Sequence, residues 1–463
     1  MTDTLQRVIG ELVGDLEQRF PYAAALLSGA SGIQISDNGS EQSAGEVNPS
    51  RGVVFTVYDG AVFDEYASSD LDPDRLARGV RQWASGLTRR TDGPPLATGA
   101  PADGSRDERS FQVAMEIDPT SVPLKDKLAL IRDIQQRTKA MDSRIVQAQV
   151  RYGDTTRESV YTGRGRRLTQ QVTRTLLAVL VAVSDGSQVR YQFTVNAGTK
   201  GFEVTRISDE ELRKTVDVAL RLLEAQKIEP GDYDVVADSG VSGVIAHESF
   251  GHGVELDLFP KGRALSAQYL NKQVAAPTIS MFDDPSVPGG YGSYFFDDEG
   301  EIARPVQILR DGVFVLPISD FASATYAPGE HTANGRRQDF TRKTYARMTN
   351  TFFAPGDVAP ADMIAGVERG VYLRWPESGM EDPMGWGIQV TAHYGEEIVN
   401  GQLTGKLFAP VGITGYVPDV LKSITAVGSD FELLGGATCG KGHKEFVPVS
   451  SGGPHLRMKA RLG

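Results

Sequence analysis

Two histidines, His247 and His252, lie five positions apart and enclose the letters ESFG. On a regular α-helix this spacing leaves the two side chains roughly 140° apart, so one straight helix cannot direct both imidazoles to a single metal ion. If both rings bind one ion, the helix must widen by one residue or end before the second ring. Gly251 and Gly253 flank His252, and glycine tolerates the backbone angles that either departure needs. We therefore expect a wide turn, or the helix end, between Ser249 and Gly253.

A third metal-binding side chain lies far downstream. Cys439 is the only cysteine in the chain and belongs to the glycine-rich run GGATCGKGH, residues 435–443. Two imidazoles and one thiolate form the three-ligand set of a catalytic zinc ion whose fourth position stays open. Glu248 directly follows His247 and supplies the general base that such a site needs. The pattern predicts a zinc-dependent hydrolase with His247, His252 and Cys439 as ligands.

Each of these features also has a plainer interpretation. A histidine pair can lie on a solvated helix face, and a lone cysteine is usually a small buried side chain. Cys439, however, has glycine, lysine and histidine as neighbours, which suggests an accessible thiolate in a flexible loop. Glu255 and Asp257 follow the histidine motif closely, and either is an alternative third ligand. We favour a supporting role for both, in which they hold the histidines in position.

Several sequence blocks occur in a characteristic order: VIAHESFGHGVELD (244–257), PGGYGSYFFDDEG (288–300), GRRQ (335–338), RMTNT (347–351), and TCGK (438–441) followed by PV (448–449). Together they resemble the TldD/PmbA family of metallopeptidases, on its catalytic, TldD-like side. The resemblance extends from about residue 120 to the C-terminus. Several long motifs in one order are far more specific than any one of them alone.

The resemblance implies that the three predicted ligands bind zinc and that Glu248 is the general base. It also implies hydrolysis of flexible or unfolded peptides, and a dimer with a second copy or with a non-catalytic paralogue. Two segments depart from the family pattern. Residues 386–394 are a divergent version of a strand block, which bears on substrate preference. Residues 442–445 replace the usual tail, so that His443 adds an imidazole near the presumed metal.

A peptide hydrolase also needs a donor that stabilises the oxyanion. The candidates are His443, Arg336, Arg337 and Tyr294, and the sequence does not rank them. A closed site with His443 as fourth ligand would instead be structural. The chain would then be a regulatory or binding protein with a structural zinc, but Glu248 has no evident role in that interpretation. A zinc amidohydrolase that acts on small molecules is the third possibility.

Composition is consistent with a large intracellular enzyme. A chain of 463 residues exceeds the size at which one core usually suffices, which predicts two domains. The formal charge of −12 argues against nucleic acid as a partner. The longest apolar run, residues 176–183, is too short to span a membrane. One cysteine, and acidic residues throughout positions 1–20, predict a cytoplasmic protein without a secretion signal.

Periodicity predicts an α+β protein with a mixed N-terminal α+β domain, residues 1–228, and a β-rich catalytic domain, residues 229–463, that carries the metal-binding helix. Apolar spacing and capping residues predict helices at 5–16, 76–87, 124–141 and 208–223, and later at 240–252, 360–368 and 418–424. Asp72 precedes the second of these helices, and Ser208 and Glu211 form a capping box at the start of the fourth. Strands are expected at 145–152, 176–183, 235–237 and 306–309, a solvated turn at 164–167 and an exposed loop at 93–106. All six histidines lie from His247 onward, so we assign the chemistry to the second domain and access or assembly to the first.

We expect the substrates to be short or unfolded peptides that bind in an extended form inside an enclosed site. An extended peptide can pair with a sheet edge through main-chain hydrogen bonds, with little side-chain preference. A dimer is the simplest way for a chain of this length to enclose such a site. Because the motif is complete in this chain, we favour a homodimer over a heterodimer with a paralogue that lacks the motif.

Overall fold

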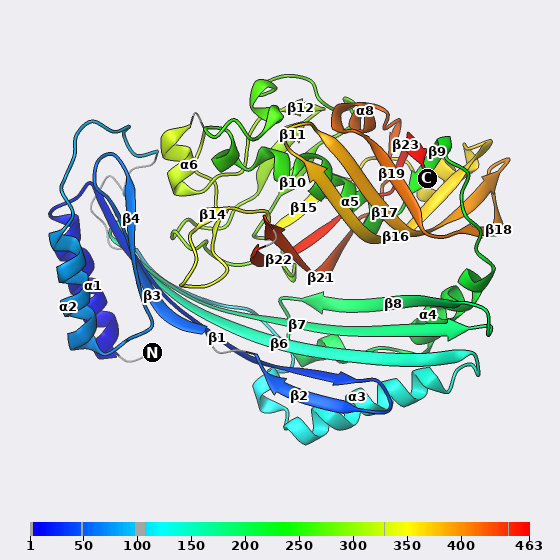
Figure 1. Ribbon diagram of the computed structural model, residues 1–463, viewed down its shortest axis with the longest axis horizontal. Coiled ribbons are helices and arrows are strands. Elements are labelled where there is room, and N and C mark those ends of the chain that lie inside the picture. Colours follow the sequence, from blue (N-terminus) through cyan, green and yellow to red (C-terminus); the bar gives the residue numbers. More distant parts are fainter. Residues whose placement is uncertain (1–2, 48–49, 98–106, 328, 443) are drawn as a thin grey trace.

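The computed structural model describes all residues except 1–2, 48–49, 98–106, 328 and 443 (Figure 1). The first half of the chain contains α1 (Asp3–Glu17), β1 (Tyr22–Asp37), β2 (Gln42–Glu46), β3 (Ser50–Tyr58), β4 (Phe63–Ser68), α2 (Pro73–Ser85), β5 (Asp107–Gln112), α3 (Leu124–Lys139), β6 (Ile145–Gly163), β7 (Arg166–Ser184), β8 (Val189–Gly198) and α4 (Asp209–Arg221).

The second half contains β9 (Gly231–Ala237), α5 (Ser239–Phe250), β10 (Met281–Asp283), β11 (Val306–Arg310), β12 (Val313–Phe314), α6 (Phe321–Tyr326), β13 (Gly335–Arg336), β14 (Tyr345–Ala346), β15 (Asn350–Phe353), α7 (Pro360–Ala365), β16 (Arg369–Asp382), β17 (Gly387–Val399), β18 (Gln402–Phe408), β19 (Val411–Tyr416), α8 (Val417–Lys422), β20 (Ala426–Val427), β21 (Glu432–Lys441), β22 (Lys444–Gly453) and β23 (Leu456–Leu462). No helix in the described ranges is long and apolar enough to cross a membrane.

The N-terminal sheet has the strand order β4-β3-β1-β6-β7-β5, with β2 paired to β1 and β8 paired to β7. Its longest strands, β6 and β7, form an antiparallel hairpin whose pairing extends from Ile145–Val183 to Gly163–Arg166. The strands expected at 145–152 and 176–183 are therefore the far ends of two longer strands. Figure 1 shows this sheet as a long curved platform beneath the C-terminal part of the chain. The turn expected at 164–167 joins the two strands, with positive φ at Arg164 and Gly165.

Helices cover two regions of this sheet. Near the N-terminus α1 packs with α2, whereas α3 and α4 lie against β6 and β8 (Figure 1). The apolar stripe of α1 is buried as its spacing predicts, through Leu5, Ile9, Leu12, Val13 and Leu16. Asp72 caps α2, and the capping box of Ser208 and Glu211 begins α4, as the sequence indicates. Part of the loop expected at 93–106 lies outside the described residues.

The C-terminal part has two larger sheets with α5 between them. One has the order β16-β9-β23-β19-β17-β18, and the other β12-β11-β10-β15-β22-β21. α5 contacts β16 and β17 of the first sheet and β15, β21 and β22 of the second. Its residues are buried on nearly all sides, which is typical of a core helix. Gly243 permits this packing, because a Cβ atom there would lie 2.3 Å from the main-chain nitrogen of Gly452.

The predicted fold class is confirmed: a mixed N-terminal part precedes a β-rich part whose central helix carries the histidine motif. Helices expected at 240–252, 360–368 and 418–424 correspond to α5, α7 and α8, each slightly shorter than expected. The short helix α6 was not predicted, although Asp320 and Ser323 form a capping box at its start. The division at residues 228 and 229 stays a prediction.

Candidate metal centre

The helix that carries His247 ends within the histidine motif. α5 ends at Phe250, and His252 begins a short 3-10 helix. A Cβ atom at Gly251 would lie 2.2 Å from Sδ of Met348 and 2.3 Å from the carbonyl oxygen of His247, so a larger residue does not fit there. The change of direction brings the rings of the two histidines to a centroid separation of 5.2 Å, with their planes 89° apart. The predicted break in the helix is confirmed.

Cys439 reaches the histidines from a strand. It lies in β21, opposite Val447 of β22, and its side chain is buried. The expectation of an accessible thiolate in a flexible loop is therefore wrong. Glycines occur in this strand because other segments pass close to it: a Cβ atom at Gly435, for example, would lie 2.8 Å from Cβ of Tyr291.

Three side chains direct their donor atoms to one point. Sγ of Cys439 lies 3.3 Å from Nε2 of His252, and the donor atoms of His247, His252 and Cys439 all lie within 4.8 Å of one another. Nδ1 of His247 is buried without a hydrogen-bond partner among the described residues. Burial opposes ionisation of the thiol, but the two imidazoles outweigh it and hold the pKa of Cys439 well below its usual value. A thiolate with two imidazoles is a donor set that Zn²⁺ prefers, so these residues fit a zinc ion.

Acidic residues after the motif support His252 from its other side. Oε1 of Glu255 lies 3.6 Å from Nδ1 of His252, the ring nitrogen that faces away from the thiol. Nζ of Lys441 lies 2.8 Å from Oε2 of Glu255 and 2.6 Å from Oδ1 of Asp257. Burial raises the pKa of Glu255, but Lys441 and His252 lower it far more, which keeps the carboxylate charged. These contacts suit the supporting role favoured for both acids.

Arg347 is a residue of the site that the sequence analysis did not predict. Its guanidinium is buried, and Nη2 donates to the carbonyl oxygen of Cys439 at 2.8 Å and approaches its Sγ at 3.2 Å. Nε lies 3.6 Å from Oε1 of Glu255. Arg347 thus joins the strand of the cysteine to the acid behind His252. Its position in the RMTNT block was the only signal, since a pattern of residues does not show which arginine is buried.

The candidate base lies against the neighbouring sheet. Glu248 is in α5, and Gly379 of β16 leaves room for it, because a Cβ atom there would lie 2.4 Å from Cγ of Glu248. A second acid, Glu381, accepts a hydrogen bond from the main-chain N–H of Gly253 at 3.0 Å. Burial raises the pKa of Glu381 well above its usual value, and Glu248 adds to the shift. Glu381 is a further residue of this region that the sequence did not indicate.

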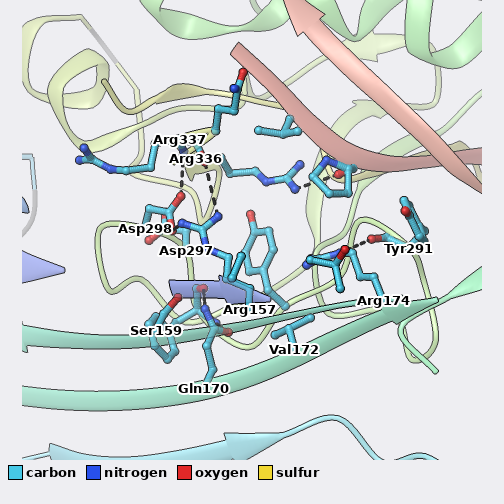
Figure 2. A pocket seen from close by; sticks show the side chains of 17 residues that line it. Arg157, Ser159, Gln170, Val172, Arg174, Tyr291, Asp297, Asp298, Arg336 and Arg337 are labelled. Carbon is cyan, nitrogen blue, oxygen red and sulfur yellow. Dashed lines mark hydrogen bonds and ion pairs between the residues drawn. The ribbon is translucent and has the colours of Figure 1, made fainter. Parts of the chain in front are cut away.

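Three of the four proposed oxyanion donors, Tyr294, Arg336 and Arg337, do not belong to the three-residue cluster. The hydroxyl of Tyr294 donates to the carbonyl oxygen of Ala333 at 2.6 Å. Arg336 and Arg337 line a separate cavity with Tyr294, shown in Figure 2. His443 lies outside the described residues. The role of all four as oxyanion donors stays a prediction.

A second group of potential metal ligands consists of Asp297, Glu299 and His331. Main-chain N–H groups already bind both acids: Gly335 donates to Asp297 at 2.9 Å, and Phe321 donates to Glu299 at 2.7 Å. Burial raises the pKa of both carboxyl groups well above the usual value, which favours their protonated forms. This group therefore suits a metal less well than the cluster with the thiolate.

Comparisons with known proteins identify the family to which this chain belongs. Residues 117–227 match the model of the PmbA/TldA metallopeptidase central domain, and residues 230–461 match that of the C-terminal domain. The chain belongs to the PmbA/TldD family of metallopeptidases, as its sequence blocks suggest. A metalloprotease of Methanothermobacter thermautotrophicus is 33% identical over 345 residues, which are 74% of each chain.

More distant relatives agree with this placement. A zinc metalloprotease TldD homolog of Saccharolobus solfataricus is 26% identical over 320 residues, 66% of this chain and 69% of the relative. Among solved structures, a Thermotoga maritima protein with a proposed role in modulating a DNA gyrase has a TM-score of 0.78 at 18% identity and covers 99% of this chain and 100% of its own. TldE from Thermococcus kodakarensis has a TM-score of 0.73 at 15% identity, and the match covers 98% of this chain and 99% of TldE. At these identities the two structures support the fold alone.

Proposed function

We propose that this chain is a zinc-dependent peptidase whose metal is held by His247, His252 and Cys439. The observation that carries the proposal is the convergence of two imidazoles and a thiol from distant parts of the chain, beside a glutamate in the same helix. The name of the Saccharolobus solfataricus relative supports zinc as the metal. When bound, zinc supplies a Lewis acid that polarises the scissile carbonyl and makes a water molecule more acidic.

The other side chains of the site have a catalytic or a positioning role. Glu248 accepts the proton of the attacking water and then donates it to the leaving amine. Glu255 fixes the orientation of the His252 ring, and Lys441 and Arg347 hold Glu255 in turn. Orientation matters because a displaced ligand also displaces the reacting groups.

The proposed substrates are short or unfolded peptides that bind in an extended form. β21, which carries Cys439, packs beside β8 of the N-terminal sheet, so this sheet borders the region of the site (Figure 1). A second chain across the remaining side would enclose it, in a homodimer or, as the alternative, in a heterodimer with a paralogue that lacks the motif. We further propose a cytoplasmic location, because a single cysteine suits a reducing compartment.

The substitution Glu248→Gln tests the proposal, because it removes the base and keeps the ligands. The variant should retain zinc and fold, and should lose peptide hydrolysis by two or more orders of magnitude (about 10²-fold to 10⁴-fold). A variant with near wild-type activity would overturn the mechanism. A variant that unfolds or loses its metal would favour the alternative of a structural zinc in a regulatory or binding protein. Hydrolysis of small amides without hydrolysis of peptides would favour the amidohydrolase.

A further inference from the structure

A cavity of about 190 Å³ lies between the N-terminal sheet and the C-terminal part of the chain. Its floor is formed by β6 and β7, and its roof by loops and by the start of β22 (Figure 2). Four arginines line it, together with two aspartates: Arg157, Arg174, Arg336, Arg337, Asp297 and Asp298. We call this cavity the arginine pocket.

Two of the arginines have a carboxylate partner. Nη2 of Arg157 lies 2.9 Å from Oδ1 of Asp298, and Nη2 of Arg337 lies 2.8 Å from Oε1 of Glu65. The charges of these two guanidinium groups are therefore balanced within the chain. Figure 2 shows Asp298 between the side chains of Arg157 and Arg337.

The other two arginines bind only neutral acceptors in the described part of the chain. Arg174 donates to the carbonyl oxygens of Tyr291 and Ser293, each at 2.7 Å. Arg336 donates to the carbonyl oxygens of Met348 at 2.5 Å and Pro448 at 2.8 Å. Neither has a carboxylate within ion-pair distance among the described residues. These contacts fix both guanidinium groups in place, but neither group forms a direct ion pair.

The remaining carboxyl group of the pocket does not supply the missing charge. Burial, with Glu299 as a further cause, raises the pKa of Asp297 well above its usual value, which favours the neutral acid. Burial and the nearby Arg336 lower the pKa of Arg174 to about 9. The Arg174 side chain as a whole is partly exposed, so the lowered pKa reflects the buried position of its guanidinium group. The guanidinium groups of Arg174 and Arg336 thus repel each other, and neither has a direct carboxylate partner among the described residues.

Burying a charge is costly unless a partner of opposite charge is present. A carboxylate is the natural partner, because its two oxygens match the planar donors of a guanidinium group. A further donor is available in the floor of the pocket: Oγ of Ser159 is buried and has no hydrogen-bond partner among the described residues. The ring of Tyr294 lies 5.3 Å below the guanidinium carbon of Arg336 and keeps that group in position.

The arginine pocket is connected to the metal centre through one hairpin. Val447 and Pro448 of β22 line the pocket, and Val447 is the register partner of Cys439. Arg336 binds the carbonyl oxygen of Pro448 directly. A substrate that extends along this hairpin could therefore reach both places.

We propose that the arginine pocket binds a carboxylate of the peptide substrate through Arg174 and Arg336, and so selects and positions peptides for the metal centre. This inference rests on the proposed function, which supplies the peptide. Two sources share the chemistry: the carboxylate at the C-terminus of the peptide and the side chain of an acidic residue. The small volume admits one such group and excludes a folded partner.

Matched peptides test the proposal with the wild-type protein. One pair differs only in a free or amidated C-terminus, and a second pair differs only in Glu or Gln at one position. We expect one of these neutral substitutions to lower kcat/KM by about tenfold to a hundredfold, mainly through KM, as loss of a charged hydrogen-bonded pair predicts. The pair that shows the difference identifies the source of the carboxylate.

The variant Arg174→Gln should remove this preference and cleave both members of the pair at similar rates. Arg174→Lys should restore part of the preference, because it keeps the charge without the bidentate geometry. Arg206→Gln is the matched control, since Arg206 is exposed and paired with Glu116 outside the pocket. Equal cleavage of all peptides by the wild type, or an unchanged preference in a folded Arg174→Gln protein, would overturn the proposal.

Direct binding keeps this test separate from the proposed function. The Glu248→Gln protein, titrated with the same peptides in a calorimeter, should bind the carboxylate form more tightly, and the double variant with Arg174→Gln should not. If Glu248→Gln shows Arg174-dependent binding but the wild-type protein hydrolyses none of the peptides, the pocket stands and the proposed function is overturned. If inorganic phosphate competes in an Arg174-dependent manner while the peptides are not distinguished, the pocket binds free anions and the substrate proposal is wrong.

Discussion

Sγ of Cys439 lies 3.3 Å from Nε2 of His252, although the two residues are 187 positions apart in the sequence. The contact requires α5 to end at Phe250 and the hairpin of β21 and β22 to lie across that end. Arg347 reinforces it, because its guanidinium binds the main chain of Cys439 and approaches the carboxylate behind His252. The proposed metal centre thus depends on packing between elements that are separate in sequence.

Replacement of Cys439 should abolish high-affinity zinc binding. Cys439→Ala removes a proposed ligand, and because loss of an outer contact already costs about tenfold to a hundredfold in affinity, we expect a loss of more than about 100-fold. Zinc content at limiting metal measures it. His455→Gln is a control, since His455 binds Asp430 and Tyr372 away from the cluster. Full zinc occupancy in Cys439→Ala would show that the third ligand is another residue.

Replacement of Glu255 should lower zinc affinity by a smaller but measurable amount. Glu255→Gln keeps the size of the side chain and removes the negative charge that faces Nδ1 of His252. We expect zinc affinity to fall by about tenfold to a hundredfold, between the values of Cys439→Ala and the wild type. Competition with a chelator gives the ranking. An effect as large as that of Cys439→Ala would indicate that Glu255 is itself a ligand.

Gly379 should be essential for the position of the base. A methyl group in Gly379→Ala would lie 2.4 Å from Cγ of Glu248 and 2.7 Å from Cγ1 of Val244, so Glu248 must move. Displacement of a catalytic group by about 1 Å can cost about 10²-fold in rate, and we expect a loss of that order in kcat with zinc retained. Gly387→Ala, in the neighbouring strand, is the matched control because nothing lies within 4 Å of its Cβ position. Equal activity of the two variants would contradict the placement of Glu248.

The proposed enclosed site predicts a dimer in solution that cleaves unfolded substrates faster than folded ones. We expect sedimentation to give twice the mass of the chain, and digestion of an unfolded protein at least about tenfold faster than of its folded form, because only an extended segment can pair with a sheet edge. Co-expression with a paralogue that lacks the motif distinguishes a heterodimer of the two chains from the homodimer. A monomer that cleaves both substrates equally well would refute the enclosed site.

The sequence predicted the local features of this structure better than its long-range ones. The spacing of His247 and His252, with Gly251 before the second ring, was sufficient to predict the broken helix, because helical geometry is local. The apolar stripe of α1 and the capping box of α4 could also be predicted from the sequence. The burial of Cys439 could not be predicted, because it results from contacts between β21 and other strands rather than from the neighbouring glycines.

The partners of the site were harder to predict for the same reason. Arg347, Lys441 and Glu381 contact the metal region or its acids through tertiary packing, and nothing in their local patterns distinguishes them from surface residues. The arginine pocket is a further example. Arg174 lies in a strand of the N-terminal sheet, whereas Arg336 lies in β13, and only the fold brings both to one cavity.

His331 should make stability depend on pH. Burial lowers the pKa of His331 to about 4 from 6.5, and neither ring nitrogen has a hydrogen-bond partner among the described residues. Because the folded pKa lies below the unfolded one, the unfolded state binds the proton first. The stability contribution is thus complete above pH 6.5 and is lost as the pH falls toward 4, by about 2 kcal/mol at pH 5.

Comparison with His331→Gln isolates this contribution. The raised pKa values of the nearby Asp297 and Glu299 act in the opposite direction, since acids that protonate more easily when folded favour the folded state at low pH. Urea midpoints of both proteins at pH 8 and pH 5 give the difference, and we expect the wild type to lose more stability than the variant between the two values. An identical shift in both proteins would mean that the ring of His331 gains a proton as easily in the folded chain as in the unfolded one.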